Sequence, residues 1–248
     1  MKYCFFLGGY DLEMLEIKRL LLAHGYTEGI DVFDKKLGWG AQLSDYADVF
    51  QTDKINVCIE LTEDIKPPIH YRRIDHHNEL SDLSSSLEQV AQLLGISLSR
   101  EQLLIAENDR HYIPGMKAIG ATDAEIADVR KRDRAAQGVT NEDEKLAEKS
   151  IAENMSTLAL RKLVVHSLTD RFSTITDRLF GQYDSLLIYK DMELTYYGEG
   201  KEALEVTFAD LLRGDKMYAG GGFIGVGKGK LKKEAFENVL KTIKQNIT

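Results

Sequence analysis

Three short apolar segments of the sequence are each followed by side chains that can bind a metal ion. The segments and the groups that follow them are residues 3–7 with Asp11, residues 55–59 with Glu60, and residues 70–74 with Asp75-His76-His77. In an open parallel sheet, ligands bind outside the carboxyl ends of the strands, so these side chains are expected to converge there. Carboxylate and imidazole groups are common ligands of divalent cations. The pattern therefore predicts a metal site at one edge of a sheet.

Asp75-His76-His77 is the most informative of these groups. An acid next to two imidazoles can hold a divalent ion through one or two side chains and leave another to face a substrate. The same three residues would also occur in a polar turn whose histidines form hydrogen bonds to the backbone. The sequence of the triplet alone leaves both interpretations open.

The segments around these groups have the patterns of an α/β domain. Apolar residues recur at helical spacing from Leu12 to about His24, and another helix is expected over 87–95 after three serines. Those serines fit an N-cap, although their hydroxyls could also contact an anion. A further helix begins near Ser99 and reaches Asp109, and the charged stretch 122–154 is interpreted as surface helices that lead into a connector. A strand, a glycine turn and a helix in this order indicate a parallel α/β unit.

The second half of the chain has a pattern of its own. A strand is expected at 163–165, a helix at 173–179 and a hairpin over 185–198, with a final amphipathic helix at about 232–247. We therefore expect an α/β protein of two domains, with a larger parallel-sheet domain over 1–145, a linker over 146–157 and a smaller α/β domain over 158–248.

The composition excludes several classes of protein. The 248 residues carry a net charge of -8, which disfavours a coat for long nucleic acid or a binder of anionic membranes, since both need a basic face. The apolar start of the chain is too short for a signal peptide or a membrane span. Cys4 and Cys58 lie in apolar runs and are expected to be buried thiols in a reducing compartment. A cytoplasmic protein is the expectation.

Specific motifs resemble those of the DHH phosphoesterases. Residues 74–78 (Ile-Asp-His-His-Asn), followed by residues 84–90, look like the family signature, and Gly220-Gly221-Gly222 resembles the triple glycine of its smaller C-terminal domain. The family includes single-strand exonucleases, oligoribonucleases, cyclic-dinucleotide phosphodiesterases and inorganic pyrophosphatases. The resemblance runs over most of the chain and implies an active-site cleft between the two domains.

The resemblance also implies roles for individual residues. The expected metal ligands are Asp11, Glu13, Glu60, His76 and Asp109, for one or two ions of Mn²⁺ or Mg²⁺. His77 would assist the substrate or leaving group, and Asp75 would serve as a ligand or orient its neighbours, so both are candidate catalytic residues. Candidate contacts to substrate phosphate are Arg110, His111, Gly220, Gly221 and Gly222.

The sequence departs from the family pattern at several places. Leu7 stands where the first motif has a histidine, Glu13 and Glu60 stand for aspartates, and Phe223 stands where a histidine follows the glycines. Two hypotheses follow. The chain is a metal-dependent phosphohydrolase for a small phosphoester or short nucleotide, or it is a degenerate protein of the same fold that binds such a ligand without turnover. A homodimer is compatible with either.

Overall fold

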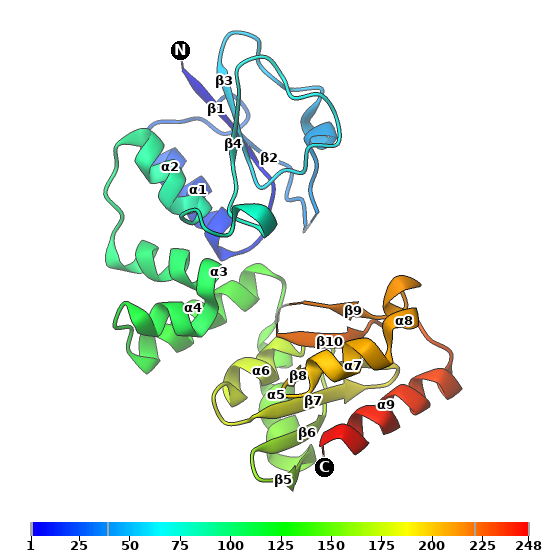
Figure 1. The fold of residues 1–248 in the computed structure, drawn as a ribbon. Coiled ribbons are helices and arrows are strands. Elements are labelled where there is room, and N and C mark those ends of the chain that lie inside the picture. Colours follow the sequence, from blue (N-terminus) through cyan, green and yellow to red (C-terminus); the bar gives the residue numbers. More distant parts are fainter. Residues whose placement is uncertain (1, 39, 221, 248) are drawn as a thin grey trace. The chain divides into compact units, whose positions relative to one another are not determined.

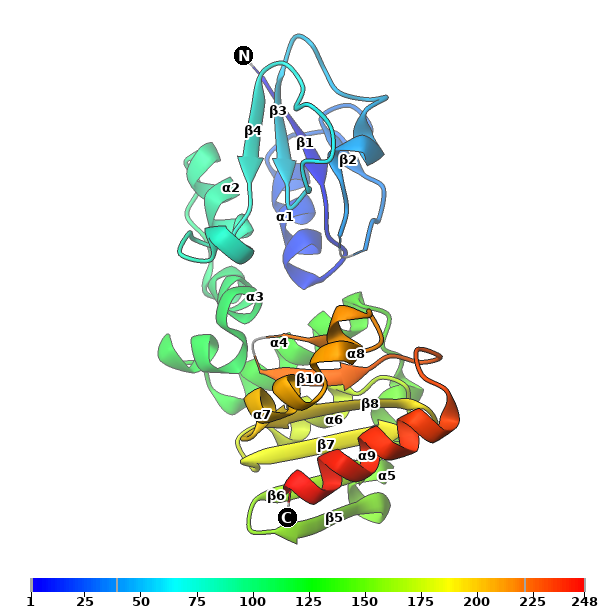
Figure 2. The same ribbon diagram turned by 45° about the vertical axis from the view of Figure 1, so that its right-hand side comes forward.

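The chain folds into two compact units, which are residues Met1–Gly138 (unit 1) and Val139–Thr248 (unit 2). The structure, a computed structural model, describes residues 2–38, 40–220 and 222–247. Figures 1 and 2 show each unit as a sheet covered by helices. The predicted α/β class, with a parallel sheet in the N-terminal part and a second α/β part after it, is confirmed.

Unit 1 is built on a four-stranded parallel sheet with the order β2-β1-β3-β4. The strands are β1 (Tyr3–Leu7), β2 (Val32–Asp34), β3 (Ile55–Ile59) and β4 (Tyr71–Ile74). The helices are α1 (Leu12–Ala23), α2 (Ser86–Leu94), α3 (Arg100–Ala118) and α4 (Asp123–Ala136), with short 3₁₀ turns at Leu43–Tyr46 and Asn78–Leu80. The chain leaves β1 toward β2 on one side and β3 lies on the other. The carboxyl ends of β1 and β3 therefore form a topological switch point, where ligands bind in such sheets.

Alternation along β1 fixes the two faces of this sheet. Cys4 and Phe6 pack with Leu43 and Tyr46 in one apolar cluster, while the intervening Phe5 is buried against the other face. Cys4 and Cys58 are both buried free thiols, as expected. A rigid sheet with buried faces gives the strand ends fixed positions.

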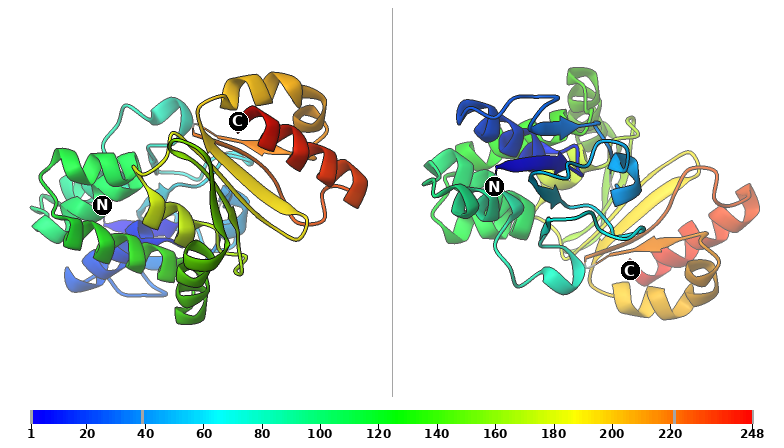
Figure 3. Two further views of the ribbon diagram at one scale, coloured as in Figure 1. Left: turned by 90° about the horizontal axis from the view of Figure 1, so that it is seen from below. Right: turned by 90° about the horizontal axis from the view of Figure 1, so that it is seen from above.

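Unit 2 is built on a six-stranded mixed sheet with the order β5-β6-β7-β8-β10-β9. Its strands are β5 (Met155–Ala159), β6 (Lys162–His166), β7 (Ser185–Lys190), β8 (Glu193–Gly198), β9 (Tyr218–Ala219) and β10 (Phe223–Val226). Its helices are α5 (Asn141–Asn154), α6 (Ser173–Leu179), α7 (Lys201–Thr207), α8 (Ala209–Arg213) and α9 (Lys233–Ile247). Residues from α5 and α6 form one cluster with alternate positions of β6 and β7, and residues from α7 and α9 form another on the opposite face (Figure 3).

The domain boundary differs from the one that the sequence suggests. The expected first domain ends at residue 145, whereas unit 1 ends at Gly138. The expected linker over 146–157 is occupied by the second half of α5 and the start of β5. The charged sequence of α5 does not indicate a helix that packs on a core, because its buried residues are the small Ala147 and Ser150. Among the described residues, no helix is both long and apolar enough to span a membrane.

Candidate metal centre

Four side chains at the carboxyl edge of the unit 1 sheet form a cluster of potential metal ligands. Glu60, His76, His77 and Asp109, which we call the donor cluster, each place one ligand atom within 4.8 Å of the others. Glu60 follows β3, the two histidines follow β4, and Asp109 projects from α3. The convergence of strand-end side chains that the sequence predicts is therefore present in the structure.

The distances within the donor cluster centre on His76. Its Nε2 atom lies 2.7 Å from Asp109 Oδ2 and 3.5 Å from Glu60 Oε1. Glu13 Oε2 is also 3.5 Å from this nitrogen, so this buried glutamate borders the cluster. The His77 Nε2 atom lies 3.4 Å from Glu60 Oε2. Glu60 thus approaches His76 with one carboxylate oxygen and His77 with the other.

Local backbone features hold these side chains in place. Glu60 has a φ of 53°, a conformation that costs energy for a residue with a side chain and turns it at the end of β3. Gly8 makes room for this turn, because a Cβ at that position would lie 2.3 Å from Glu60 O. Ser86 Oγ donates a hydrogen bond of 2.7 Å to Glu60 Oε1. The strained residue is therefore fixed from two sides.

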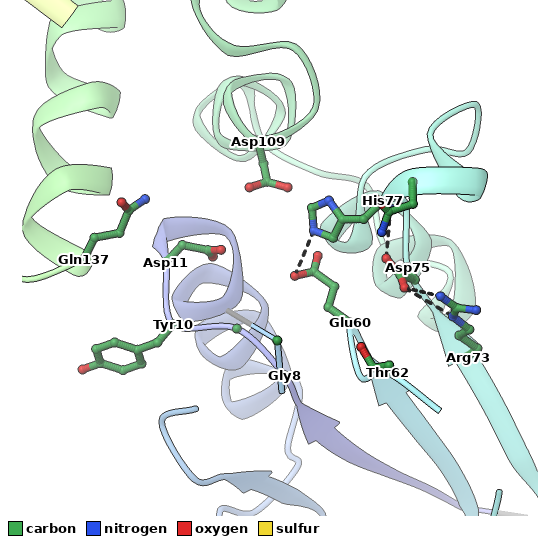
Figure 4. Close-up of a pocket in the computed structure, with 13 residues that line it drawn as sticks. Gly8, Tyr10, Asp11, Glu60, Thr62, Arg73, Asp75, His77, Asp109 and Gln137 are labelled. Carbon is green, nitrogen blue, oxygen red and sulfur yellow. Dashed lines mark hydrogen bonds and ion pairs between the residues drawn. The ribbon is translucent and has the colours of Figure 1, made fainter. Parts of the chain in front are cut away.

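Asp109 lies just before an interruption of helix α3. Tyr112 has φ 58° and ψ -147°, outside the helical region, and Pro114 follows. Proline has no N–H to donate to the carbonyl four residues earlier, and its ring disfavours a helical residue before it. The helix breaks one turn after Asp109. The Asp109 carboxylate points toward the space that Glu60 and His77 also face (Figure 4).

Three buried atoms at this site have no hydrogen-bond partner, which tests whether the residues fit a metal ion. They are Glu13 Oε2, His76 Nε2 and Asp109 Oδ2. The short approach of His76 to Asp109 is not oriented as a hydrogen bond. Glu13 Oε2 and Asp109 Oδ2 lie within ion-pair distance of His76 Nε2, yet none of the three atoms makes an oriented hydrogen bond, and buried polar atoms normally make one. Their types are nitrogen and oxygen ligands, and this set fits a divalent cation.

Burial and like charges perturb the carboxyl groups around the site. Burial, and then the charge of Asp109, raises the pKa of Glu13 well above its usual value. The same two causes raise the pKa of Asp11 to about 7. Crowded carboxyl groups that resist ionisation are typical of sites that a cation completes.

The two histidines have raised pKa values for a related reason. Burial lowers the pKa of His76, but the carboxylates of Asp109, Glu13 and Glu60 raise it more, to about 12. Glu60 raises the pKa of His77. Burial raises the pKa of Glu60, yet His76 and His77 lower it further, and the net result lies below its usual range. Without a cation, protonated histidines balance the carboxylates.

A pocket of about 510 Å³ opens beside the donor cluster (Figure 4). Its described lining comprises Gly8, Gly9, Tyr10, Asp11, Gly40, Glu60, Thr62, Arg73, Asp75, His77, Asn78, Asp109 and Gln137. The His77 side chain is 45% exposed, in contrast to the buried His76. His77 can therefore meet a ligand in the pocket while His76 cannot. The sequence hypothesis assigns His76 to the metal and His77 to the substrate, and this assignment stays a prediction.

Asp11 and Glu13 lie at the same edge but outside the donor cluster. Asp11 caps α1, and its Oδ1 accepts a 2.8 Å hydrogen bond from Met14 N. Glu13 is 2% exposed, and its Oε1 accepts a bond from Leu87 N. Leu7, in the place of the family histidine, is a buried core residue.

Asp75, Arg110 and His111 also lie outside the donor cluster. Asp75 pairs with Arg73 through Oδ2 and accepts a hydrogen bond from His77 N through Oδ1, so both of its oxygens are already engaged. His111 pairs with Glu107 of its own helix at 2.9 Å. Arg110 is absent from the described pocket lining.

The glycine motif belongs to unit 2. Gly220 lies at the β9–β10 connection, where a Cβ would meet the Phe223 ring at 2.5 Å. Phe223 also contacts the rings of Tyr197 and Tyr218. Gly222 has open space around its Cα, and Gly221 lies outside the described residues. Packing against Phe223 is thus one reason for glycine at position 220.

The sequence indicates the three serines as an N-cap or an anion contact, not as a partner of Glu60, and it does not single out Arg73. Ser85 is the N-cap of α2, which leaves the next hydroxyl, that of Ser86, for Glu60. Arg73 comes two residues before Asp75 on β4, and strand alternation places both on one face. That alternation is a signal from which the pair could have been found.

Comparison with known proteins identifies the fold. No protein-family model matches the sequence, and no curated protein matches it either. The structure resembles that of PggH, a pGpG-specific phosphodiesterase from Vibrio cholerae, with a TM-score of 0.53 and 13% identity over 99% of this chain and 98% of that one.

Two further structures resemble the chain less closely. An exopolyphosphatase-related protein from Bacteroides fragilis has a TM-score of 0.46 and 12% identity, with 99% of this chain and 93% of that chain covered. RecJ from Thermus thermophilus, solved with Mn²⁺, has a TM-score of 0.47 and 12% identity, with 98% and 52% covered. The resemblance to DHH phosphoesterases that the motifs indicate is confirmed at the level of the fold.

Proposed function

We propose that this protein is a divalent-metal-dependent phosphohydrolase that acts on a small phosphoester or short nucleotide. The observation that carries the proposal is the donor cluster with its three unpartnered buried atoms, at the switch point of a parallel sheet. The fold supports it, since the similar Vibrio structure is that of a phosphodiesterase. A pocket of about 510 Å³ next to the cluster has room for a small ligand.

Glu60, His76 and Asp109 would hold the ion, which we take to be Mn²⁺ or Mg²⁺, with Glu13 and Asp11 available to a second ion. A bound divalent cation would polarise a phosphoryl oxygen and lower the pKa of a water molecule. Ser86 keeps the Glu60 carboxylate aimed at the histidines through its 2.7 Å hydrogen bond. His77, half-exposed and with a raised pKa, can donate a proton or hydrogen bond to a phosphate or leaving-group oxygen.

The net charge and the comparison both support a choice of substrate class. A net charge of -8 disfavours long nucleic acid, whose binding needs many basic contacts. The Vibrio protein is specific for pGpG, a dinucleotide. We therefore place short linear dinucleotides first among candidate substrates.

The test is metal-dependent hydrolysis of pGpG by the purified full chain. We expect turnover with Mn²⁺ or Mg²⁺ that EDTA abolishes. His76→Gln and Asp109→Asn should lower kcat by at least about 100-fold, because each removes a ligand. His24→Gln is the matched control, since His24 is an exposed histidine of unit 1 that is absent from the described pocket lining. Equal turnover by His76→Gln and wild type would refute the proposal.

A second candidate function rests on Leu7 and Phe223. Leu7 is buried and cannot replace the family histidine as a ligand, and Phe223 packs among aromatic rings and offers no hydrogen-bond donor. These positions favour a protein that binds a nucleotide without turning it over. Saturable binding of pGpG with no product, across several divalent metals, would select this alternative.

A further inference from the structure

Arg73 gives the pocket a positive charge in an otherwise acidic lining. Among the described residues that line the pocket, Arg73 carries the one permanent positive charge. The acids of the same lining are Asp11, Glu60, Asp75 and Asp109. A cation at the donor cluster would serve one phosphate group. Arg73 pairs with Asp75 of the same lining, yet its side chain stays partly exposed.

Asp75 holds the Arg73 side chain in a fixed orientation. Asp75 Oδ2 accepts hydrogen bonds from Arg73 Nη2 at 2.7 Å and from Arg73 Nε at 3.3 Å. The aspartate is itself fixed, because its Oδ1 accepts His77 N at 3.0 Å and its carbonyl accepts Gln89 Nε2 at 2.9 Å. A guanidinium paired in this way loses little further freedom when it binds a ligand.

The guanidinium keeps donors for a ligand. Arginine has five N–H groups, and the pairing with Asp75 engages the Nε edge and one hydrogen of Nη2. The Nη1 atom lies 3.6 Å from Oε1 of the exposed Glu79, beyond hydrogen-bond distance. The Arg73 side chain is 33% exposed. Planar N–H pairs of this kind suit a phosphate group.

Arg73 and the donor cluster lie on opposite sides of Asp75. Figure 4 shows Asp75 between the Arg73 guanidinium and His77, with Glu60 and Asp109 beyond. A phosphoryl group held at the cluster and an anion held by Arg73 would therefore be two different groups of one ligand. Thr62 and Asn78 also line the pocket and offer neutral polar groups.

We propose that Arg73 forms a binding subsite for a second phosphate of the substrate, distinct from the phosphoester that is cleaved. The inference rests on the proposed function and specifies its substrate class, which is short nucleotides that carry a terminal phosphate in addition to a diester. Asp75 is a positioning residue in this account, because it acts through Arg73.

The experiment compares two dinucleotides that differ by one phosphate. Rates of Mn²⁺-dependent hydrolysis are measured for pGpG and for GpG, which lacks the terminal phosphate. The wild type should prefer pGpG in kcat/KM. Arg73→Gln should reduce that preference about 10- to 100-fold, the range for one charge-assisted bidentate contact, mainly through a higher KM for pGpG.

Two variants control for charge and for folding. Arg72→Gln removes the neighbouring charge on the same strand, but Arg72 points to the other face of β4 and is absent from the described lining, so the preference should stay unchanged. Arg73→Lys keeps the positive charge but loses the planar guanidinium that binds two oxygens, and it should retain part of the preference for pGpG. If Arg73→Gln melts at a lower temperature than the wild type, Arg73→Lys provides the test in its place.

The outcomes separate this inference from the proposed function. If the wild type hydrolyses both dinucleotides and Arg73→Gln keeps the same preference, the subsite does not exist although the function stands. If the wild type hydrolyses neither, the proposed function fails, and calorimetric binding of pGpG and GpG with Ca²⁺ decides the subsite. A binding preference for pGpG that Arg73→Gln abolishes would support it, and equal affinities would overturn it.

Discussion

Asp11→Asn should stabilise the metal-free protein while it weakens metal binding. Asp11 caps α1 through its bond to Met14 N, and asparagine is an equally good N-cap, so the helix should not suffer. Burial and the charges of Asp109 and Glu60 raise the pKa of Asp11 from 3.8 to about 7. Ionising this carboxyl group in the folded protein is therefore costly, and asparagine avoids that cost.

The magnitude follows from the two pKa values. The difference between the folded-state and unfolded-state pKa values of Asp11 corresponds to a loss of at most about 4 kcal/mol in the free energy of unfolding, at 1.36 kcal/mol for each pH unit. The Asp11 side chain is partly exposed, so solvent screens the interaction, and we expect about 1–2 kcal/mol. The folded-state pKa is the higher one, so the wild type loses this stability as the pH rises from 3.8 to about 7. The advantage of Asp11→Asn should be small at about pH 4, roughly a third of its full size at about pH 5 and complete at about pH 8.

The assay is urea denaturation with EDTA, followed by tryptophan fluorescence. Trp39 is the one tryptophan of the sequence, and its number falls within the range 1–138 that also contains Asp11. Asp11→Ala should differ from Asp11→Asn by about 1 kcal/mol, the value of the lost cap. If Asp11→Asn were less stable than wild type at about pH 8, or if its effect did not vary with pH, the charge crowding inferred here would be refuted.

Three further substitutions test how the site is supported. Gly8→Ala should destabilise unit 1 by several kcal/mol in urea denaturation, because the new Cβ would lie 2.3 Å from Glu60 O, a backbone clash in a packed site. Gly38→Ala is the control and should have little effect, since a Cβ there would meet open space. Ser86→Ala should weaken Mn²⁺ binding in calorimetry by about 3- to 10-fold, because it removes the hydrogen bond to Glu60. Ser85→Ala removes the N-cap of α2 instead, so it should cost about 1 kcal/mol of stability and leave the Mn²⁺ affinity unchanged. Asp133→Leu should cost about 2–4 kcal/mol in the same denaturation assay, because it removes a buried carboxylate that pairs with Arg130 at 2.7 Å and accepts a hydrogen bond from Leu12 N at 3.3 Å. A loss below about 1 kcal/mol would contradict this prediction.

Much of the donor cluster could be predicted from the sequence, because strand ends in a parallel sheet share one edge. The apolar runs before Glu60 and before Asp75-His76-His77 indicate buried parallel strands, and the residues after them must then meet. Asp109 required the family resemblance, since nothing in the spacing along α3 shows which helical residue faces the sheet edge.

Other parts of the site could not be predicted from local patterns. The positive φ of Glu60 depends on contact with Gly8, and the break at Tyr112 depends on how α3 packs beyond Asp109. The linker prediction failed for a similar reason. Charge density along 146–157 suggests exposure, but burial of a small residue such as Ala147 is enough to join a helix to a core.

Manganese titration by calorimetry tests the central claim most directly. The full chain should bind at least one Mn²⁺, and His76→Gln should lose that binding because His76 Nε2 lies at the centre of the donor cluster. His24→Gln should bind as the wild type does. A wild-type chain that binds no Mn²⁺, or a His76→Gln variant with unchanged affinity, would contradict the assignment of this cluster as a metal centre.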